Sequence, residues 1–133
     1  SVVYNLGDST GYASGGDTYA ILKDADVVKP DSSKNSVFWH EDWRSIDNGA
    51  FGIRPVGTDV WWNLPTSVHN VGCCMSFFDG HAEYWKWKGS VVTAPGQPEW
   101  PIGVGANVSV PASSPNDMID LVRAQATVKP GLP

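Results

Sequence analysis

An Asp-Gly pair between two aromatic runs is the feature that most limits what this chain can fold into. Residues 73–78 and 81–87 are rich in apolar and aromatic side chains, and Asp79-Gly80 lies between them. Asp-Gly is favoured in two-residue hairpin turns, because type I′ geometry needs positive φ at both central positions. The sequence therefore predicts an antiparallel hairpin over residues 71–88.

A two-residue turn also fixes how the two strands pair. Residues that lie directly opposite each other across an antiparallel ladder are the contacting side-chain pairs. The predicted pairs are Phe78 with His81, Met75 with Tyr84, and Cys74 with Trp85.

Cys73 and Cys74 are the two cysteines of the chain, and they are neighbours. Adjacent residues of a strand point to opposite faces. A disulfide between them would close a tight, strained ring. We interpret both as free thiols, with a vicinal or intermolecular disulfide as the alternative.

Other segments predict further strands and one helix. Residues 36–40 and 50–53 combine β-branched and aromatic side chains and are expected to be strands. Ser114-Pro115-Asn116-Asp117 is typical of a helix start, with an N-cap serine and a proline at the first position. A helix of about three turns should follow, and its apolar face is expected to comprise Met118, Ile119, Leu121 and Val122.

The prolines and glycines of residues 90–113 predict a long irregular loop. With 133 residues the chain is expected to form one domain, residues 1–133. The predicted class is α+β: a small antiparallel sheet centred on the 71–88 hairpin, long loops and a short C-terminal helix.

The charge balance disfavours two classes of partner. The net charge is −5, and basic residues do not cluster. Nucleic acids and anionic membrane surfaces are therefore not expected to bind. A stretch of the roughly 20 apolar residues that a spanning helix needs is also missing from the sequence.

The turn belongs to a longer motif. His69 is followed, after nine residues, by Asp79-Gly80 and then His81. This spacing resembles the marker of the prepilin-type processing-associated family of pilin-like and pseudopilin-like proteins. Other segments resemble the family in the same order: Ser1-Val2-Val3-Tyr4-Asn5, Val37-Phe38-Trp39-His40-Glu41 (with His40 where the family has Asp), Ser45-Ile46-Asp47-Asn48-Gly49-Ala50-Phe51 and Asn116-Asp117-Met118.

The resemblance implies a structural role and not an enzyme. It implies the exported head of a type IV pilus-like or type II secretion pseudopilus-like filament subunit, outside the cell or on its surface, with identical subunits as partners. Family members begin with an apolar helix of about 25 residues, which lies in the membrane before assembly and in the filament core afterwards. We expect that helix to be trimmed from this chain or to be a separate polypeptide, and membrane contact to occur only through it. The motif residues that the resemblance marks are Glu41, Asp47, Gly49, His69, Asp79, Gly80 and His81.

The histidines and acids near the motif match no catalytic pattern. His40, Glu41 and Asp42 are consecutive, and the sequence contains neither His-Glu-x-x-His nor Gly-x-Ser-x-Gly. A metal-dependent hydrolase is therefore the least favoured function. Instead, His69 is expected to form hydrogen bonds at the hairpin base and Asp79 to fix the turn.

No cofactor is indicated, but calcium has candidate ligands. Asp47, Asn48 and Asp59 offer the hard oxygen atoms that calcium prefers, as do Asp8 and Asp17 in the first loop. The chain has no twelve-residue EF-hand pattern, and solvated loop acids are the alternative interpretation.

Seven tryptophans are many for so short a chain. A domain of this size does not enclose seven such rings completely. Trp61, Trp62, Trp85 and Trp87 are candidate contacts to a neighbouring subunit or to sugar rings, with core packing as the alternative. A secreted carbohydrate-binding module is accordingly the alternative function.

Overall fold

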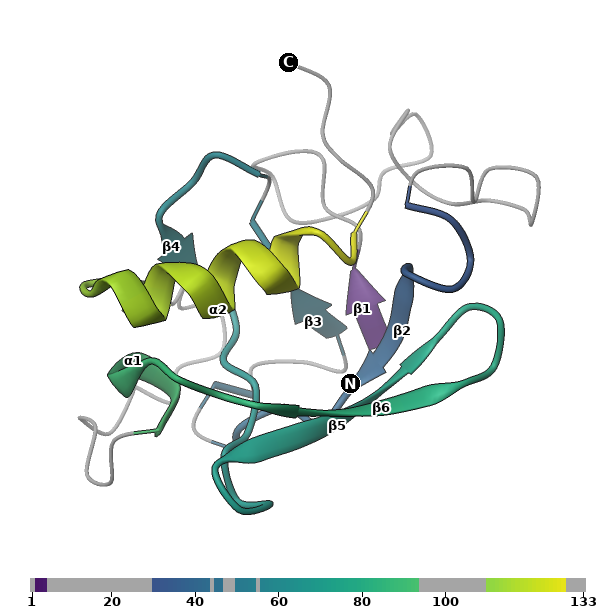
Figure 1. The fold of residues 1–133 in the computed structure, drawn as a ribbon, viewed down its shortest axis with the longest axis horizontal. Coiled ribbons are helices and arrows are strands. Elements are labelled where there is room, and N and C mark those ends of the chain that lie inside the picture. Colours follow the sequence, from purple (N-terminus) through teal and green to yellow (C-terminus); the bar gives the residue numbers. More distant parts are fainter. Residues whose placement is uncertain are drawn as a thin grey trace.

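The computed structural model describes residues 2–4, 30–43, 45–46, 50–54, 56–93 and 110–128. Within these ranges a five-stranded sheet has the order β3-β1-β2-β5-β6 (Figure 1). Its strands are β1 (Val2–Tyr4), β2 (Ser36–Trp39), β3 (Ala50–Gly52), β5 (Gly72–Phe77) and β6 (Ala82–Lys86). The other elements are β4 (Val60–Trp61), β7 (Val110–Pro111), α1 (Ser90–Thr93) and α2 (Pro115–Gln125).

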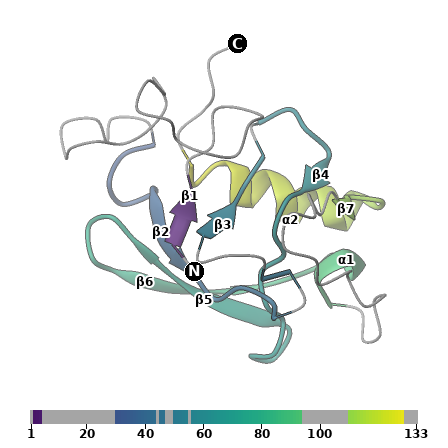
Figure 2. The ribbon, with the colours of Figure 1, turned by 180° about the vertical axis from the view of Figure 1, so that it is seen from behind.

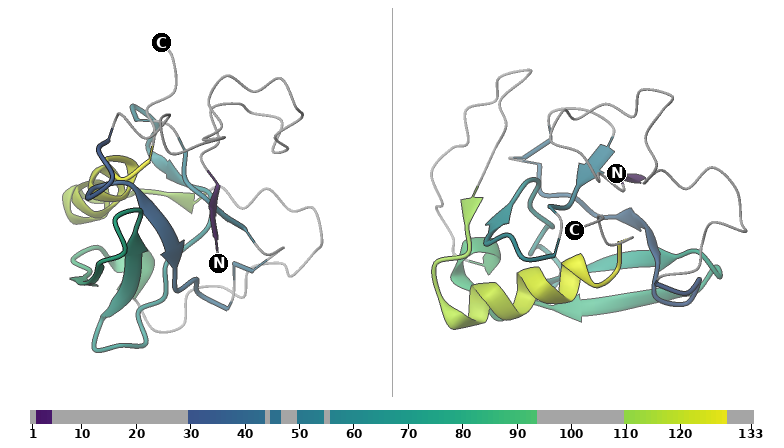
Figure 3. Two further views of the ribbon diagram at one scale, coloured as in Figure 1. Left: turned by 90° about the vertical axis from the view of Figure 1, so that its right-hand side faces the viewer. Right: turned by 90° about the horizontal axis from the view of Figure 1, so that it is seen from above.

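The pairing within the five-stranded sheet is antiparallel except between β1 and β3, which run parallel. β4 and β7 form a separate antiparallel pair. Helix α2 lies in front of β1 and β3 in Figure 1 and behind them in Figure 2. The right-hand view of Figure 3 shows α2 alongside the β5–β6 ribbon, whose strands extend past the end of the helix. The predicted α+β class, with its hairpin and C-terminal helix, is confirmed.

The hairpin has a turn one residue longer than predicted. The N–H of Phe77 donates to the carbonyl of His81 at 2.9 Å, so the loop consists of Phe78, Asp79 and Gly80. Gly80 has a φ of 91° and is the one residue of this loop with positive φ. Type I′ geometry needs positive φ at Asp79 as well, so the two-residue turn is not formed. A three-residue loop with glycine in the left-handed region replaces it.

The longer loop shifts the strand register by one residue. Cys73 pairs with Trp85, Cys74 with Tyr84 and Met75 with Glu83. The predicted pairs Phe78–His81, Met75–Tyr84 and Cys74–Trp85 are therefore wrong. Because a one-residue slip exchanges the two faces of a strand, the shift decides which side chains enter the core, namely Cys73, Met75, Phe77 and Trp85.

Helix α2 begins as predicted at Ser114. The hydroxyl of Ser114 accepts the N–H of Asp117 at 3.2 Å, and the Asp117 carboxylate accepts the N–H of Ser114 at 2.9 Å. This reciprocal capping box, with Pro115 in the first turn, satisfies donors that a helix start leaves free. The helix ends at Gln125 with Ala126 as its C-cap.

The apolar face predicted for α2 is divided between core and solvent. Leu121 is fully buried, whereas Ile119 is 49% and Val122 50% exposed. Two carboxylates occupy the buried side of the helix in their place. Asp120 accepts the N–H groups of Lys88 and Gly89, each at 2.7 Å, and Asp117 accepts the N–H of Val91 at 2.9 Å. The helix thereby satisfies the backbone between β6 and α1.

Trp39 lies at the centre of the core. Its ring stacks on Phe51 and on Trp87, with centroids 5.0 and 6.0 Å away, and meets Trp85 edge-on at 5.8 Å. Leu121 of α2 belongs to the same buried cluster. The core therefore joins aromatic rings of the five-stranded sheet and its hairpin to Leu121 of α2.

The structure describes only some of the residues that were predicted to form loops. Residues 90–113 are not wholly irregular, because α1 and β7 lie at the two ends of that stretch. The segment Asp47-Asn48-Gly49 lies outside the described residues, as does the loop containing Asp8 and Asp17.

Candidate interaction surface and hairpin motif

His69 lies at the base of the hairpin, in the turn that precedes β5. Its N–H donates to the carbonyl of Gly72 at 3.3 Å, and its carbonyl accepts the hydroxyl of Tyr84 at 2.7 Å. The predicted hydrogen bonds at the hairpin base are therefore present. The side chain of His69 points elsewhere, to His40, with 2.8 Å between the two ring nitrogens.

Asp79 and His81 form a polar cluster at the hairpin tip. The Asp79 carboxylate accepts both the N–H of His81, at 3.2 Å, and its ring Nδ1–H, at 2.5 Å. The other ring nitrogen, Nε2, is 3.4 Å from Glu83. The His81 ring also stacks on Phe77, with centroids 4.4 Å apart. Asp79 thus fixes the turn through His81.

These contacts shift the pKa values of both partners. The hydrogen bond that the His81 ring donates to Asp79, with a smaller contribution from Glu83, raises the pKa of His81. The hydrogen bond from His81 lowers the pKa of Asp79. Because the pKa of His81 is higher in the folded protein than in the unfolded chain, protonated His81 stabilises the fold. This contribution is fully present below the pKa of the unfolded state and is lost as the pH rises through the pKa of the folded state. The pKa of Asp79 is lower in the folded protein, so ionised Asp79 also stabilises the fold. That contribution is present above the pKa of the unfolded state and is lost as the pH falls through the pKa of the folded state.

Removing the Asp79 charge should bring the His81 pKa back toward its ordinary value. We expect Asp79→Asn to lower the pKa of His81 toward 6.5, and Glu83→Gln to lower it less, because Asp79 is the stronger partner. A proton NMR titration of the His81 ring measures both shifts. An unchanged His81 pKa in Asp79→Asn would contradict the assignment of the tip contact.

Among the remaining motif acids and calcium candidates, the structure describes Glu41 and Asp59. Glu41 is buried, forms a β-bridge with Pro65, and accepts the Ser45 hydroxyl at 3.2 Å. Asp59 is exposed. Asp47, Asn48 and Gly49 lie outside the described residues. Across the described ranges, no three His, Cys, Asp or Glu side chains are grouped to hold a metal ion.

Three of the four candidate contact tryptophans lie in the core. Trp61, Trp85 and Trp87 are buried, and the Trp87 Nε1–H donates to the carbonyl of Thr66 at 2.9 Å. Trp62 is half-buried beneath the Arg54 guanidinium, which lies 4.7 Å from its ring centroid. Sugar stacking needs an exposed ring face, so this arrangement favours the core-packing interpretation for the three buried rings.

The two cysteines are unpaired and point to opposite faces, with Cys73 buried and Cys74 exposed. Burial raises the pKa of the Cys73 thiol to about 12. Cys73 is therefore protonated and unreactive at neutral pH.

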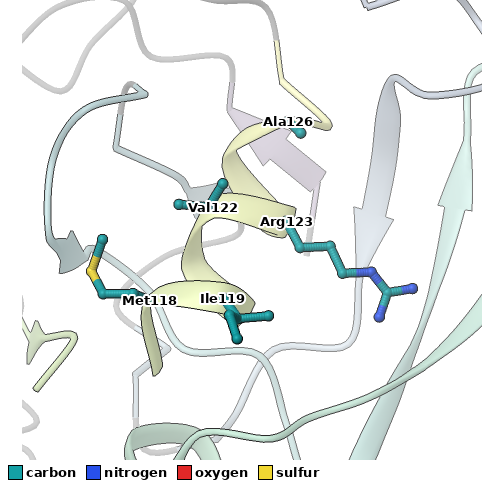
Figure 4. A pocket seen from close by; sticks show the side chains of 5 residues that line it. All are labelled: Met118, Ile119, Val122, Arg123 and Ala126. Atoms are coloured by element: carbon teal, nitrogen blue, oxygen red, sulfur yellow. The ribbon is translucent and has the colours of Figure 1, made fainter. Parts of the chain in front are cut away.

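An apolar stripe runs along the outer side of α2. Met118, Ile119, Val122 and Ala126 line a shallow groove there, with Arg123 at its edge (Figure 4). Arg123 extends toward the strands, and its guanidinium lies 3.6 Å from the ring centroid of Trp85. We call these five residues the α2 stripe.

The sequence predicts Met118, Ile119 and Val122 as members of an apolar helix face, but it does not indicate that Ile119 and Val122 are exposed. One signal could have indicated this exposure: Asp117 and Asp120 are three positions apart and so lie on the same side of the helix. There they accept backbone N–H groups from the segment between β6 and α1. The sequence also does not indicate the contact between His40 and His69, because no local pattern links residues so far apart in sequence.

Comparisons with protein-family models, with curated proteins and with solved structures found no match. Within the described residues, no helix is long and apolar enough to cross a membrane.

Proposed function

We propose that this chain is the globular head of a structural subunit in an extracellular filament of the type IV pilus or type II secretion pseudopilus kind. Identical heads are its partners, and an apolar N-terminal helix, in the same polypeptide or a separate one, supplies the filament core. The ordered motifs that resemble prepilin-type processing-associated proteins support this proposal. The role is assembly and not catalysis.

The observation that carries the proposal is the α2 stripe. A surface helix normally turns its apolar side to the core, yet α2 buries Asp117 and Asp120 and leaves Ile119 and Val122 half exposed. Covering either side chain would contribute roughly 1 kcal/mol, because complete burial of such residues is worth about 1.5–3 kcal/mol. The stripe therefore favours contact with a second surface.

The occupant that we propose for the stripe is a neighbouring head in the same filament. A small apolar contact of this kind is too weak to hold two free heads together. Along a filament, however, subunits are already held side by side through their helices, so each lateral contact forms at high effective concentration. Head-to-head packing then adds rigidity without a strong isolated interface.

A charge placed in the stripe should block assembly while leaving the head folded. We expect Ile119→Glu or Val122→Glu to reduce filaments carrying this chain by about tenfold, the effect of about 1.4 kcal/mol at the contact. Because both positions are half exposed, the head itself should lose little stability. Immunogold electron microscopy of producing cells counts labelled filaments, and circular dichroism of the purified head checks the fold.

Asn116→Glu is the matched control. It introduces the same charge on the same helix at an exposed position outside the groove. Filament counts should remain at the wild-type level. Wild-type counts in both Ile119→Glu and Val122→Glu would contradict the role of the stripe.

A further inference from the structure

His40 and His69 are 29 positions apart in sequence and meet at the molecular surface. His40 follows β2, and His69 lies in the turn before β5. The Nδ1 atom of His40 is 2.8 Å from the Nε2 atom of His69, and the ring centroids are 4.9 Å apart. Because both side chains are exposed, an ion from solution can reach the two nitrogens without disturbing the core.

The backbone around this histidine pair is held from several sides. The His40 N–H donates to the carbonyl of Cys74 at 3.3 Å, and the His40 carbonyl accepts the N–H of Thr66 at 2.9 Å. The Tyr84 hydroxyl holds the carbonyl of His69 at 2.7 Å. Positions fixed before binding lower the entropy cost of capturing a ligand.

The turn that presents His69 is strained. Asn70 has a φ of 50° and Val71 a φ of 64°. Positive φ is uncommon outside glycine and is an outlier for a β-branched residue. Strained backbone persists only where the surrounding structure determines it, and it gathers at ligand sites. The strain here is adjacent to the histidine that completes the pair.

We propose that His40 Nδ1 and His69 Nε2 form an exposed two-histidine chelate for a divalent first-row transition metal such as Zn²⁺. Metal–nitrogen bonds of about 2.1 Å place two imidazole nitrogens about 3.0 Å apart at a right angle and about 3.4 Å apart at the tetrahedral angle that zinc favours. From the observed 2.8 Å the pair needs to open by roughly 0.2–0.6 Å, and the two rings need to turn until both lone pairs point at the ion. Imidazole is also a ligand type that zinc, copper and nickel favour.

The protons of the pair allow this exchange. One of the two facing nitrogens carries the proton of their hydrogen bond, and in a neutral imidazole that proton can move to the other nitrogen of its own ring. Both facing nitrogens then have a free lone pair. A metal ion thus replaces the shared hydrogen without net loss of a proton from the protein.

The chelate supplies two protein ligands and leaves the other positions open. Within the described residues, no third His, Cys, Asp or Glu side chain is placed to complete a closed site. Water or a donor from another molecule fills the remaining positions. The site is one of metal capture, different from the hydrolytic centre that the sequence disfavours, and it does not depend on the proposed function.

Isothermal titration of the 133-residue chain with ZnCl₂, under reducing conditions in a buffer that does not chelate, tests the site. We expect one Zn²⁺ per chain, and a loss of at least about tenfold in affinity for His40→Ala and for His69→Ala. His81→Ala and Cys74→Ser are the controls, because each removes a metal-binding side chain outside the pair that solvent can reach, and both should bind within about twofold of wild type. Circular dichroism verifies that each variant is folded.

NMR of the histidine rings provides the second readout. Zinc should shift the His40 and His69 ring signals together and leave those of His81 unchanged. Three results would overturn the proposal: no saturable binding by the wild-type chain, wild-type affinity in either His40→Ala or His69→Ala, or loss of binding in a control variant.

Discussion

Gly89→Ala should destabilise the fold by about 3 kcal/mol, as overpacking of a tight contact does. A Cβ atom on Gly89 would lie 2.3 Å from Asp117 Oδ1 and 2.6 Å from Asp117 Cα, and backbone cannot yield as a flexible side-chain tip can. Asp117 caps α2 through Ser114 and accepts the N–H of Val91. Displacing Asp117 therefore disrupts the helix start and the connection from β6 together.

Gly57→Ala separates this steric effect from the general cost of replacing a glycine. Gly57 has a φ of +96° and has open space around the position of a Cβ. Its replacement should cost only about 1 kcal/mol, from backbone strain. Equilibrium unfolding in urea measures both free energies. A Gly89→Ala cost no larger than that of Gly57→Ala would show that Asp117 and Gly89 are not in close contact.

Trp39→Ala should produce the other large loss, about 3–5 kcal/mol of unfolding free energy. Trp39 is 1% exposed and packs against three aromatic rings: Phe51 of β3, and Trp85 and Trp87 at the end of the hairpin. Truncation to alanine removes the favourable free energy of burying the indole ring. It also leaves a cavity that the surrounding sheet and helix can fill only in part. Because a domain of this size is stable by only about 5–15 kcal/mol, this loss is a large share of the free energy of unfolding, and the melting temperature of the variant should fall well below that of the wild type.

Trp43→Ala is the matched control for Trp39→Ala. Trp43 is 64% exposed, so the same truncation should change stability by no more than about 0.5 kcal/mol. Thermal unfolding followed by near-ultraviolet circular dichroism compares the two variants. Similar melting temperatures for both would show that the core is not organised around Trp39.

The sequence predicts elements well here because their signals are local. The hairpin follows from Asp79-Gly80 between aromatic runs, and the start of α2 follows from Ser114-Pro115 with Asp117 three positions after the cap. The register was wrong because Asp-Gly is compatible with more than one loop length, and only the backbone at Asp79 distinguishes them.

The features that the sequence did not reveal depend on tertiary partners. Asp120 is buried because the N–H groups of Lys88 and Gly89 need an acceptor, and this turns Ile119 and Val122 outward. The His40–His69 contact likewise requires the chain around Thr66 to lie beside the end of β2, where the N–H of Thr66 donates to the carbonyl of His40. Neither arrangement leaves a periodic signal in the sequence.

A helical reconstruction, by cryo-electron microscopy, of surface filaments from cells that produce this chain tests the central claim most directly. We expect a repeating head with the five-stranded sheet and α2, in which the α2 stripe of each copy is covered by its neighbour. Filaments built without this chain, or heads whose α2 stripes all face solvent, would contradict it.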